Sequence, residues 1–417
     1  MLQLSWPGGP LRGTAQLPAS KSESNRALIL QALAGGGQLA NLSDAHDTQL
    51  MRRLLAVAPN ENELDAEDAG TVMRFLTAYL AVTGWRGQLT GTARMQQRPI
   101  AVLVEALREL GAEIVYEGAD GFPPLRFAGF RPAAASAETP EVAVRGDISS
   151  QYISALLLVG ASLPQGLRLR LTGAIGSRPY ISMTLALLRQ FGIEVSEAEN
   201  GSTLTVASGL YQPADYTIEA DWSAASYWYA LVALAPAGSE IALPGLRQYS
   251  WQGDQAIAEL MTYFGVETTF TDAGVQLGQA TSPPLPAAPL DFTHCPDLAQ
   301  TVAVVAAARQ KPVLMTGLES LRIKETDRIA ALQAELAKFG SGLVEQAEGV
   351  FEVQSAAILD AQAPILAIET YHDHRMAMAF APLALRGPLQ INQPEVVRKS
   401  YPQFWDELRK IGFSATS

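Results

Sequence analysis

Hydroxyl and basic side chains gather in a polar turn near the N-terminus, directly before a strong helix-forming run. Ser20 or Ser22 can cap a helix, and Ser20 with Glu23 has the spacing of a capping box, so a helix is predicted to begin in this turn. Gly35-Gly36-Gly37 is placed to end it. Lys21 and Arg26 then lie at a helix N-terminus, where free backbone N–H groups and the helix dipole favour anions. The turn therefore predicts an anion-binding site. A capped surface helix with two solvated cations is the alternative.

The same combination of a polar turn and a helix start recurs along the chain. Glycine in such a turn lets backbone N–H groups approach a ligand, and arginine matches carboxylate and phosphate groups bidentately. Helix capping or a solvated arginine explains any single turn equally well, but their recurrence favours a shared cleft for anions. The candidate residues are Gly70, Arg94, Ser149, Ser150, Gln151, Ser177, Tyr180, Arg375 and Lys399.

Two carboxylates accompany these cations. Asp297 follows Pro296 at a predicted helix start, where it is expected to cap the helix and could also accept a substrate hydroxyl. Glu325 lies between Lys324 and Arg328, whose spacing of four residues places them on one helix face. Two cations beside a carboxylate keep it ionised or let it exchange a proton with a substrate. A salt-bridged helix start is the alternative.

Few residues of this chain are suited to hold a cofactor. His372 and His374 form a His-x-His pair that could bind a metal ion. The chain has four histidines and one cysteine, so an anion beside His374 and Arg375 is favoured over a metal. The sequence contains no P-loop, no strand-borne dinucleotide fingerprint and no nucleophile elbow. We therefore expect no metal and no organic cofactor.

A helix–glycine–strand pattern recurs at nearly regular intervals. The glycines are expected in the left-handed conformation that ends a helix, and a sixth, degenerate copy lies near Gln49–Val57. Such repetition indicates duplicated helix–strand modules. Six modules predict two domains of three, with a boundary near Ala220. The five glycines are Gly111, Gly192, Gly265, Gly340 and Gly412.

The bulk composition limits the class of protein. The chain has 417 residues, too many for one core, and its 48% apolar and 17% charged residues are typical of a globular enzyme. A net charge of −12 disfavours a nucleic-acid-binding protein. The N-terminus does not resemble a secretory signal, and the longest apolar runs, 153–163 and 227–237, are too short to span a bilayer. The single cysteine, Cys295, is expected to be a buried inert thiol, and a cytoplasmic location fits.

Taken in order, these stretches resemble the 5-enolpyruvylshikimate-3-phosphate synthases of the enolpyruvyl transferase family. The resemblance implies an α/β fold of two domains, each built from three βαβαββ units, with the active-site cleft between them. In this family the first strand joins the C-terminal domain, which implies one domain of residues 1–18 with 221–417 and another of residues 19–220. The resemblance runs from Leu17 to about Trp405, and its most specific motifs are Leu17–Leu28, Arg94–Ile100, Ser149–Leu156, Lys324–Arg328, Asp373–Ala377 and Lys399–Pro402.

The resemblance also implies a reaction. Members of this family transfer the carboxyvinyl group of phosphoenolpyruvate to the 5-hydroxyl of shikimate 3-phosphate and release phosphate, without a metal or organic cofactor. Phosphoenolpyruvate is protonated at C3 while the hydroxyl adds at C2, and the tetrahedral intermediate then loses a C3 proton and phosphate. The expected partners are these two small molecules, with no nucleic acid and no membrane. A monomer is expected, because the family works by closure within one chain.

Motif matches give each candidate residue an expected role. Asp297 would accept the proton of the 5-hydroxyl, and Glu325 would protonate C3 with Lys21 as its partner. The expected shikimate 3-phosphate contacts are Lys21, Ser22, Arg26, Ser149, Ser150, Gln151, Ser177, Tyr180, Asp297 and Lys324. The expected phosphoenolpyruvate contacts are Lys21, Gly70, Arg94, Gln151, Arg328, Arg375 and Lys399.

Four positions depart from the family pattern. Ala19 stands where a glycine is usual, Asp68 where an asparagine is usual, Phe75 where a proline is common and Ser320 where many members have asparagine. A carboxylate at Asp68 would repel phosphoenolpyruvate unless it is paired or turned away. None of the four is among the candidate substrate-binding or catalytic residues, so activity is still expected. Phosphoenolpyruvate affinity and the response to glyphosate are the properties that these departures affect.

Two other functions remain open. The sister transferase that uses UDP-N-acetylglucosamine as acceptor normally carries a reactive cysteine near the position of Arg94, whereas this chain has its cysteine at position 295. A non-catalytic anion-binding protein needs basic residues such as Arg375, but neither Glu325 nor Asp297.

Overall fold

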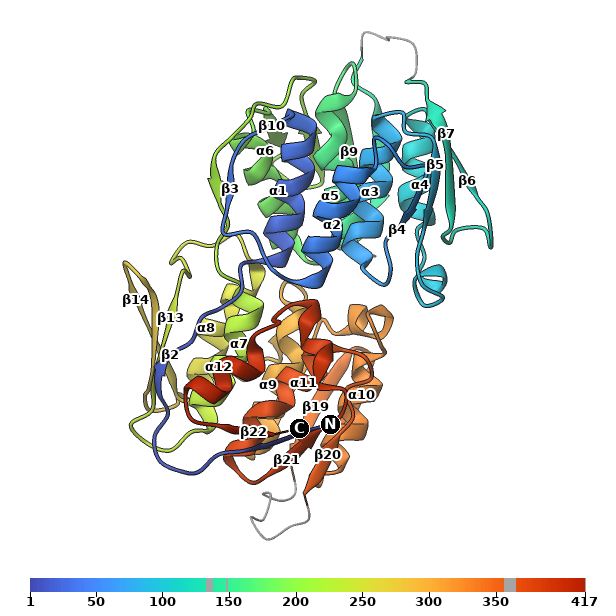
Figure 1. Cartoon of the computed structure of the whole chain (residues 1–417). Coiled ribbons are helices and arrows are strands. Elements are labelled where there is room, and N and C mark those ends of the chain that lie inside the picture. The colour runs from blue at the N-terminus through green and yellow to red at the C-terminus, as the bar shows by residue number, and fades with distance from the viewer. Residues whose placement is uncertain (133–137, 148, 356–364, 417) are drawn as a thin grey trace. The chain divides into compact units, whose positions relative to one another are not determined.

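The computed structural model describes residues 1–132, 138–147, 149–355 and 365–416. The chain divides into two compact units, one formed by Met1–Ala19 with Glu219–Ser417 and the other by Ser20–Ile218 (Figure 1). Each unit has its own hydrophobic core. The N-terminal segment therefore packs with the C-terminal half of the sequence. No helix in the described ranges is both long enough and apolar enough to cross a bilayer.

The unit Ser20–Ile218 alternates helices and short strands. Its α-helices are α1 (Lys21–Ala34), α2 (His46–Val57), α3 (Gly70–Val82), α4 (Ala101–Glu109), α5 (Ser150–Val159) and α6 (Arg178–Gln190), with 3-10 helices η1 (Met95–Gln97) and η2 (Gly160–Ser162). Its strands are β3 (Leu39–Ala40), β4 (Glu63–Asp65), β5 (Gly87–Thr90), β6 (Ala112–Tyr116), β7 (Leu125–Phe130), β8 (Glu141–Arg145), β9 (Leu167–Thr172), β10 (Val195–Glu197), β11 (Thr203–Val206) and β12 (Tyr216–Thr217).

The other unit begins with β1 (Leu2–Ser5) and β2 (Arg12–Thr14) and resumes after the first unit. Its α-helices are α7 (Trp222–Leu234), α8 (Ile257–Leu260), α9 (Ala299–Ala308), α10 (Arg328–Ala337), α11 (His374–Phe380) and α12 (Phe404–Lys410). Its 3-10 helices are η3 (Gly253–Ala256), η4 (Met261–Phe264), η5 (Pro296–Leu298), η6 (Glu319–Ile323), η7 (Ala381–Leu385) and η8 (Pro394–Lys399). Its later strands are β13 (Glu240–Pro244), β14 (Val266–Thr271), β15 (Gly274–Gln279), β16 (Leu290–Asp291), β17 (Val313–Thr316), β18 (Ser341–Ala347), β19 (Val350–Ser355), β20 (Leu366–Ile368), β21 (Leu389–Ile391) and β22 (Ser414–Thr416).

One sheet pattern recurs through both units. Two parallel strands are joined through a helix, a second helix follows, and an antiparallel pair completes the sheet, as in β4-β5-β7-β6 and β16-β17-β19-β18. The sheets β10-β11-β9-β8, β14-β15-β13-β2 and β20-β21-β1-β22 have the same arrangement. The predicted duplication of βαβαββ modules is therefore confirmed.

The sixth module is reduced, as the sequence predicted near Gln49–Val57. Its sheet in the described residues consists of β3 and β12, which pair in parallel. Its helices are α1 and α2, and α2 ends at Val57. The module is completed by strands from opposite ends of the Ser20–Ile218 unit.

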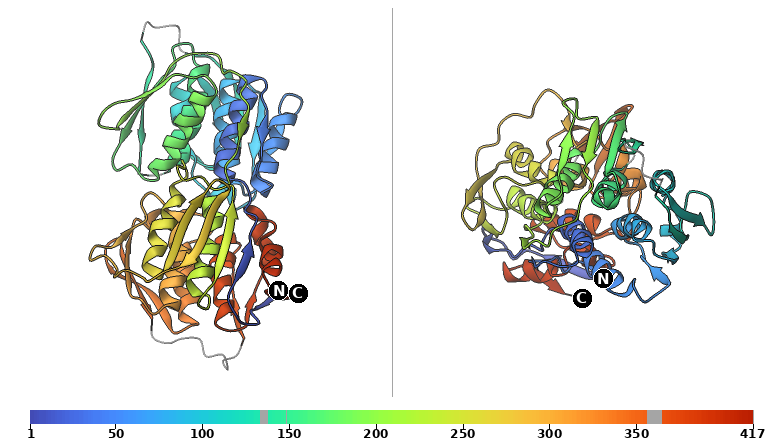
Figure 2. Two further views of the ribbon diagram at one scale, coloured as in Figure 1. Left: turned by 90° about the vertical axis from the view of Figure 1, so that its left-hand side faces the viewer. Right: turned by 90° about the horizontal axis from the view of Figure 1, so that it is seen from above.

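The N-terminal segment completes two sheets of the other unit. Strand β1 lies between β21 and β22 and is antiparallel to both, while β2 pairs in parallel with β13. The chain ends therefore lie side by side, as both N and C labels show in Figures 1 and 2. The first strand thus groups with the unit that contains the C-terminal half of the sequence.

The first helices of the three modules pack against one another in each unit. These are α1, α3 and α5 in one unit and α7, α9 and α11 in the other. Helices α5, α7, α9 and α11 are buried around nearly their whole circumference, because a helix that is apolar on all sides is stable only inside a core. The apolar runs 153–163 and 227–237 thus form buried helices, as predicted.

Glycine ends the second helix of each four-stranded module. The five glycines predicted for this role have positive φ angles: Gly111 107°, Gly192 76°, Gly265 82°, Gly340 68° and Gly412 111°. Only glycine adopts such angles without a steric cost. The chain can thus reverse from the helix into the next strand.

Candidate active site

The start of α1 carries the polar turn near the N-terminus. The hydroxyl of Ser20 accepts a hydrogen bond of 3.4 Å from the backbone N–H of Glu23, and Gly35 ends the helix with φ 67°. Both predicted helix signals are confirmed. The Nζ atom of Lys21 lies 3.0 Å from Oδ2 of Asp47, near the start of α2. This ion pair holds the ammonium group at the N-termini of two neighbouring helices.

Arg26 lies deeper than a surface cation would. Its guanidinium donates to Thr184 Oγ1 at 2.8 Å, to Ser154 Oγ at 3.0 Å and to the carbonyl of Ser22 at 2.8 Å. Burial lowers the pKa of Arg26 to about 10, although Tyr180 and Glu23 act in the opposite direction. Arg26 therefore ties α1, the helix that carries Lys21, to α5 and α6.

A hydrogen-bonded chain joins the starts of α3 and α5. Arg74 Nη1 donates to Gln151 Oε1 at 2.6 Å, and Gln151 Nε2 donates to Thr71 Oγ1 at 3.1 Å. The guanidinium of Arg74 also lies over the ring of Tyr152, 5.1 Å from its centroid. Gln151 is thus fixed by two partners on α3, and Arg74 is a site residue that the sequence argument missed.

Gly70 provides space for two guanidinium groups. A Cβ atom at this position would lie 2.7 Å from both Arg74 Nη1 and Arg98 Nη2. Arg98 is partly buried and donates to the carbonyl of Asp68, whereas the predicted Arg94 is exposed at the start of η1. Within this unit it is therefore Arg98 that lies beside Gly70. Two arginines at the N-terminus of α3 create a strongly positive site for a carboxylate or phosphate.

The remaining candidates of this unit also lie at helix starts. Ser149 caps α5 by accepting a hydrogen bond of 3.3 Å from the N–H of Gln151. Ser177 precedes α6 with φ 51°, a left-handed conformation that is uncommon outside glycine. Tyr180, in the first turn of α6, lies 5.8 Å from the Arg26 guanidinium. Hydroxyl groups and free N–H groups together suit a phosphorylated polyol.

In the other unit, Arg328 lies among three carboxylates. Its side chain is 2% exposed, and it contacts Asp373 at 2.6 Å, Asp297 at 2.8 Å and Glu325 at 2.8 Å. Burial alone lowers the pKa of Arg328, but the carboxylates of Asp373, Glu325 and Asp297 raise it above its usual range. The guanidinium is therefore permanently charged and fixes the geometry of all three carboxylates.

Asp297 lies at the centre of this cluster. Its Oδ1 is 2.8 Å from Arg328 and 4.0 Å from Lys324, and its Oδ2 is 2.8 Å from Arg375. Burial raises the pKa of Asp297, but the charges of Arg375, Lys324 and Arg328 outweigh it and hold the pKa well below its usual range. Asp297 is therefore ionised at neutral pH.

Two details of the sequence prediction for this cluster are wrong. Asp297 is not a helix cap: it lies inside η5, for which Cys295 occupies the cap position, and its carboxylate turns to the arginines. Lys324 and Arg328 do not share a helix face, because Lys324 ends η6 and α10 begins at Arg328. The two cations reach Asp297 from separate elements instead.

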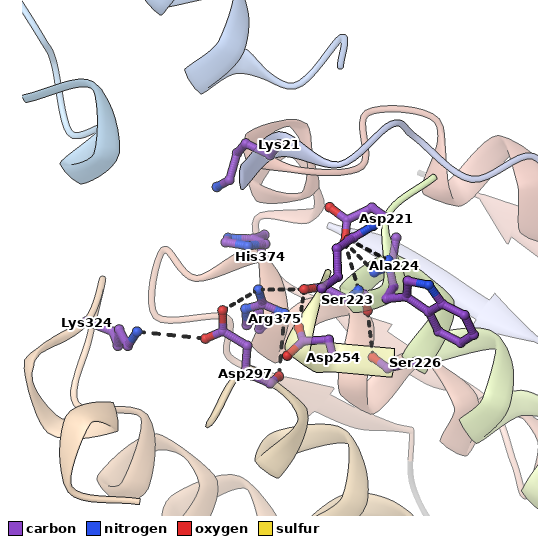
Figure 3. A network of polar contacts seen from close by, with 12 residues as sticks. Lys21, Asp221, Ser223, Ala224, Ser226, Asp254, Asp297, Lys324, His374 and Arg375 are labelled. Carbon is purple, nitrogen blue, oxygen red and sulfur yellow. Dashed lines mark hydrogen bonds and ion pairs between the residues drawn. The ribbon is translucent and has the colours of Figure 1, made fainter. Parts of the chain in front are cut away.

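Arg375 extends the cluster toward α7 (Figure 3). Asp373 caps α11 by accepting from the N–H of Arg375 at 2.8 Å, which confirms the predicted helix start. The guanidinium then reaches Asp297 Oδ2 at 2.8 Å and Ser223 Oγ at 3.4 Å. Asp221 caps α7, accepting from the N–H groups of Ser223 and Ala224. The starts of α7, η5 and α11 thus meet at one place within this unit.

Two further predicted residues can be located. Lys399 ends η8, shortly before α12, and is partly buried. Cys295 is buried, and burial raises the pKa of its thiol, with Asp254, Asp291 and Asp297 acting in the same direction. The prediction of an inert thiol is therefore supported by its surroundings.

Sequence reasoning did not single out Asp254, Ser223 or Asp373 as members of the polar network. Asp254 lies in η3, which begins the second helical segment of its module. Arg328 occupies the equivalent position in the next module. The module repeat is therefore the sequence signal that points to Asp254. Its partners are 31 or more residues away in sequence, so local spacing alone gives no hint of them.

Each unit therefore offers one kind of chemistry. The unit Ser20–Ile218 offers cations, hydroxyls and free helix N-termini, which bind phosphates and carboxylates. The other unit offers an ionised carboxylate beside a second carboxylate and three cations, which can move protons while holding an anion.

Comparison with known proteins identifies one family whose profile matches most of the chain. The profile of the family described as EPSP synthase (3-phosphoshikimate 1-carboxyvinyltransferase) matches residues 54–408. A 3-phosphoshikimate 1-carboxyvinyltransferase of Bacteroides fragilis is 48% identical over 405 residues, covering 97% of this chain and 96% of the relative. One of Cellvibrio japonicus is 39% identical over 430 residues, covering 97% and 98%.

Solved structures share the fold. An EPSP synthase of Acinetobacter baumannii aligns with a TM-score of 0.79 and 21% identity over the full length of both chains. An enolpyruvyl transferase of Streptomyces tendae aligns with a TM-score of 0.75 and 16% identity, covering 100% of this chain and 98% of the other. The expected α/β fold of duplicated modules is therefore confirmed.

Proposed function

The chain belongs to the EPSP synthase (3-phosphoshikimate 1-carboxyvinyltransferase) family, and we propose that its two units together supply the groups for that family's reaction. The enzyme transfers the enolpyruvyl group of phosphoenolpyruvate to the 5-hydroxyl of shikimate 3-phosphate and releases phosphate. This reaction belongs to the shikimate pathway, which leads through chorismate to the aromatic amino acids.

The observation that carries the residue assignment is the position of Asp297. Its carboxylate is held ionised by Arg328 and Arg375, each at 2.8 Å, with Lys324 at 4.0 Å. An ionised carboxylate can accept the proton of the 5-hydroxyl as the oxygen attacks. The surrounding cations stabilise the negative charge that the phosphoenolpyruvate group carries through the reaction.

Glu325 is the proposed proton donor to C3 of phosphoenolpyruvate, with Lys21 as its proposed partner. Protonation at C3 and formation of the bond between the 5-oxygen and C2 give a tetrahedral intermediate. Loss of a C3 proton and cleavage of the C2–O bond to phosphate then restore the double bond. Glu325 is held 2.8 Å from Arg328, so that its carboxyl group stays beside the residue proposed to bind the substrate.

The proposed substrate contacts follow the family motifs. Arg98 and Arg74 are added to the phosphoenolpyruvate set because their guanidinium groups lie beside Gly70. The other proposed phosphoenolpyruvate contacts are Lys21, Gly70, Arg94, Gln151, Arg328, Arg375 and Lys399. The proposed shikimate 3-phosphate contacts are Lys21, Ser22, Arg26, Ser149, Ser150, Gln151, Ser177, Tyr180, Asp297 and Lys324.

We also propose the domain organisation, the location and the assembly state of the enzyme. The two compact units act as the family's two domains, with boundaries near residues 19 and 219. The enzyme works as a cytoplasmic monomer, without a nucleic-acid or membrane partner. The chemistry needs only acid–base groups and anion contacts, so no metal or organic cofactor is assigned to it.

A two-acceptor assay tests the proposal. The protein is mixed with phosphoenolpyruvate and either shikimate 3-phosphate or UDP-N-acetylglucosamine, and released phosphate is measured. We expect release with shikimate 3-phosphate alone. Release with only the nucleotide sugar would move the assignment to the sister transferase, and tight binding of phosphoenolpyruvate without release would favour a non-catalytic anion-binding protein.

A further inference from the structure

A second carboxylate lies close to both Arg375 and Asp297. Asp254 is 1% exposed and accepts a hydrogen bond from the hydroxyl of Ser223. Ser223 Oγ in turn lies 3.4 Å from Nη2 of Arg375, which also contacts Asp297 at 2.8 Å. Figure 3 shows these side chains converging from η3, α7, η5 and α11. The two carboxylates are thus connected through one hydroxyl and one guanidinium.

The hydroxyl of Ser223 transmits the state of Asp254 to Arg375. An ionised carboxylate can only accept hydrogen bonds, so the Ser223 proton must point at Asp254. The lone pairs of Ser223 then face the Nη2 group of Arg375. Without an acceptor at position 254, the hydroxyl is free to rotate and to present its proton toward the guanidinium instead.

Three further contacts of the Arg375 guanidinium differ in length. Nη1 makes two long contacts of 3.4 Å, to the hydroxyl of Tyr227 and to the backbone carbonyl of Asp297. The strong contact at 2.8 Å is to the Asp297 carboxylate, a group assigned above to the chemistry. A guanidinium that must bind an anion needs a support that does not take part in the reaction.

We propose that Asp254 is a positioning residue for the enolpyruvyl transfer, which acts through the hydroxyl of Ser223 to orient the anion-binding guanidinium of Arg375. The inference rests on the proposed role of Arg375 as a phosphoenolpyruvate contact. Asp254 touches no substrate in this account. Its removal changes how well Arg375 holds phosphoenolpyruvate.

The charges around Asp254 make this support sensitive to pH. Burial raises the pKa of Asp254 to about 7, with Asp297 and Asp221 acting in the same direction and Arg375 and the Ser223 hydroxyl opposing them. The Cys295 thiol also faces this group. Oδ1 of Asp254 is buried and accepts no hydrogen bond from the part of the chain that the structure describes. That oxygen can therefore take up a proton without breaking an existing contact.

The test compares kinetic constants for phosphoenolpyruvate in a set of variants. Asp254→Ala and Ser223→Ala should each raise the KM for phosphoenolpyruvate by about 2- to 30-fold, the range for residues that act through a neighbour. Their double variant should be no worse than either single one, because both interrupt the same path. Asp254→Asn keeps an acceptor oxygen but not the charge, so at every pH it should have the KM that the wild-type protein has below pH 7, and the inflection near pH 7 in kcat/KM should disappear.

Ser226→Ala is the matched control. Ser226 is a buried hydroxyl on the same helix, which donates to the carbonyl of Ser223 and lies 3.3 Å from Thr301. It should leave the KM and the pH profile unchanged. Additive effects of Asp254→Ala and Ser223→Ala, or an unchanged KM and pH profile in Asp254→Ala, would overturn the inference.

A readout without turnover separates this inference from the proposed function. Carboxyl ¹³C NMR of the wild-type protein, assigned with Asp254→Asn, should show Asp254 titrating near pH 7 and the Asp297 resonance responding over the same range. Absence of both changes would contradict the coupling. A wild-type protein that titrates in this way but does not consume phosphoenolpyruvate would instead contradict the proposed function.

Discussion

At the scale of single residues, the positive charge of Arg328 offsets the repulsion between three closely spaced carboxylates. Asp373 is completely buried and is held by this guanidinium, while Asp297 and Glu325 are about one-fifth exposed. Removing one partner of a buried ion pair leaves uncompensated charge, which costs far more than the pair contributes. Arg328 therefore supports both the fold and the proposed chemistry.

Arg328→Ala should lower the free energy of unfolding by about 3–5 kcal/mol. Arg322→Ala is the control, because its side chain is 45% exposed and its ion pairs with Asp327 and Glu345 are 3.6 and 3.5 Å long. That change should stay within about 0.5 kcal/mol. Urea unfolding followed by circular dichroism measures both. Equal losses in the two variants would contradict the assigned role of Arg328.

Glu325→Gln tests the proposed proton donor. The amide keeps an oxygen for the contact with Arg328 but cannot deliver a proton, so kcat should fall by about 10²–10⁴-fold. The dissociation constant of phosphoenolpyruvate should change little. Glu319→Gln, on the exposed face of η6, should leave both quantities unchanged. Normal turnover by Glu325→Gln would exclude it as the donor.

At the scale of elements, the glycines after α1 test how a helix is ended. Gly35 has φ 67° and open space where a Cβ atom would lie, whereas Gly36 has an ordinary φ and only a distant contact to Pro213. Gly35→Ala should therefore cost about 1 kcal/mol of stability through its left-handed backbone. Gly36→Ala should be nearly neutral. Thermal unfolding of the two variants measures the difference, and equal melting temperatures would contradict this account.

Local signals predicted most of the elements that carry the site. Ser20 caps α1 and Gly35 ends it, and α11 begins at the expected turn, where Asp373 caps it. Such contacts join residues two to four positions apart, so the sequence pattern contains them. The repeated helix–glycine–strand pattern likewise predicted the modules, because each glycine meets a local backbone requirement.

Long-range contacts explain what the sequence prediction missed. Asp297 was expected to cap a helix, but Arg328 and Arg375, which lie 31 and 78 residues later, bind its carboxylate more strongly than a backbone N–H would. No local pattern favours Arg98 over Arg94 as the neighbour of Gly70. That choice depends on how η1 turns each side chain.

At the scale of the whole molecule, the order of the strands along the chain differs from the order in which they pair. Strand β1 is an inner strand of the sheet β20-β21-β1-β22, yet it precedes the unit Ser20–Ile218 in sequence. Residues 219–417 expressed alone should therefore fail to fold cooperatively. Gln3 pairs with Thr416, so joining residues 1–19 after residue 417 through a short linker should restore folding. Circular dichroism and urea unfolding compare the two proteins, and cooperative folding of 219–417 alone would contradict the assignment of β1.

The central claim is that the protein adds the enolpyruvyl group to a hydroxyl by protonation at C3 followed by elimination. The most direct measurement is proton and phosphorus NMR of one reaction in D₂O that contains phosphoenolpyruvate and shikimate 3-phosphate. We expect inorganic phosphate and a new enolpyruvyl ether in equal amounts, with deuterium in the vinyl methylene group of the ether. Phosphate release without the ether, or an ether free of deuterium, would contradict the account.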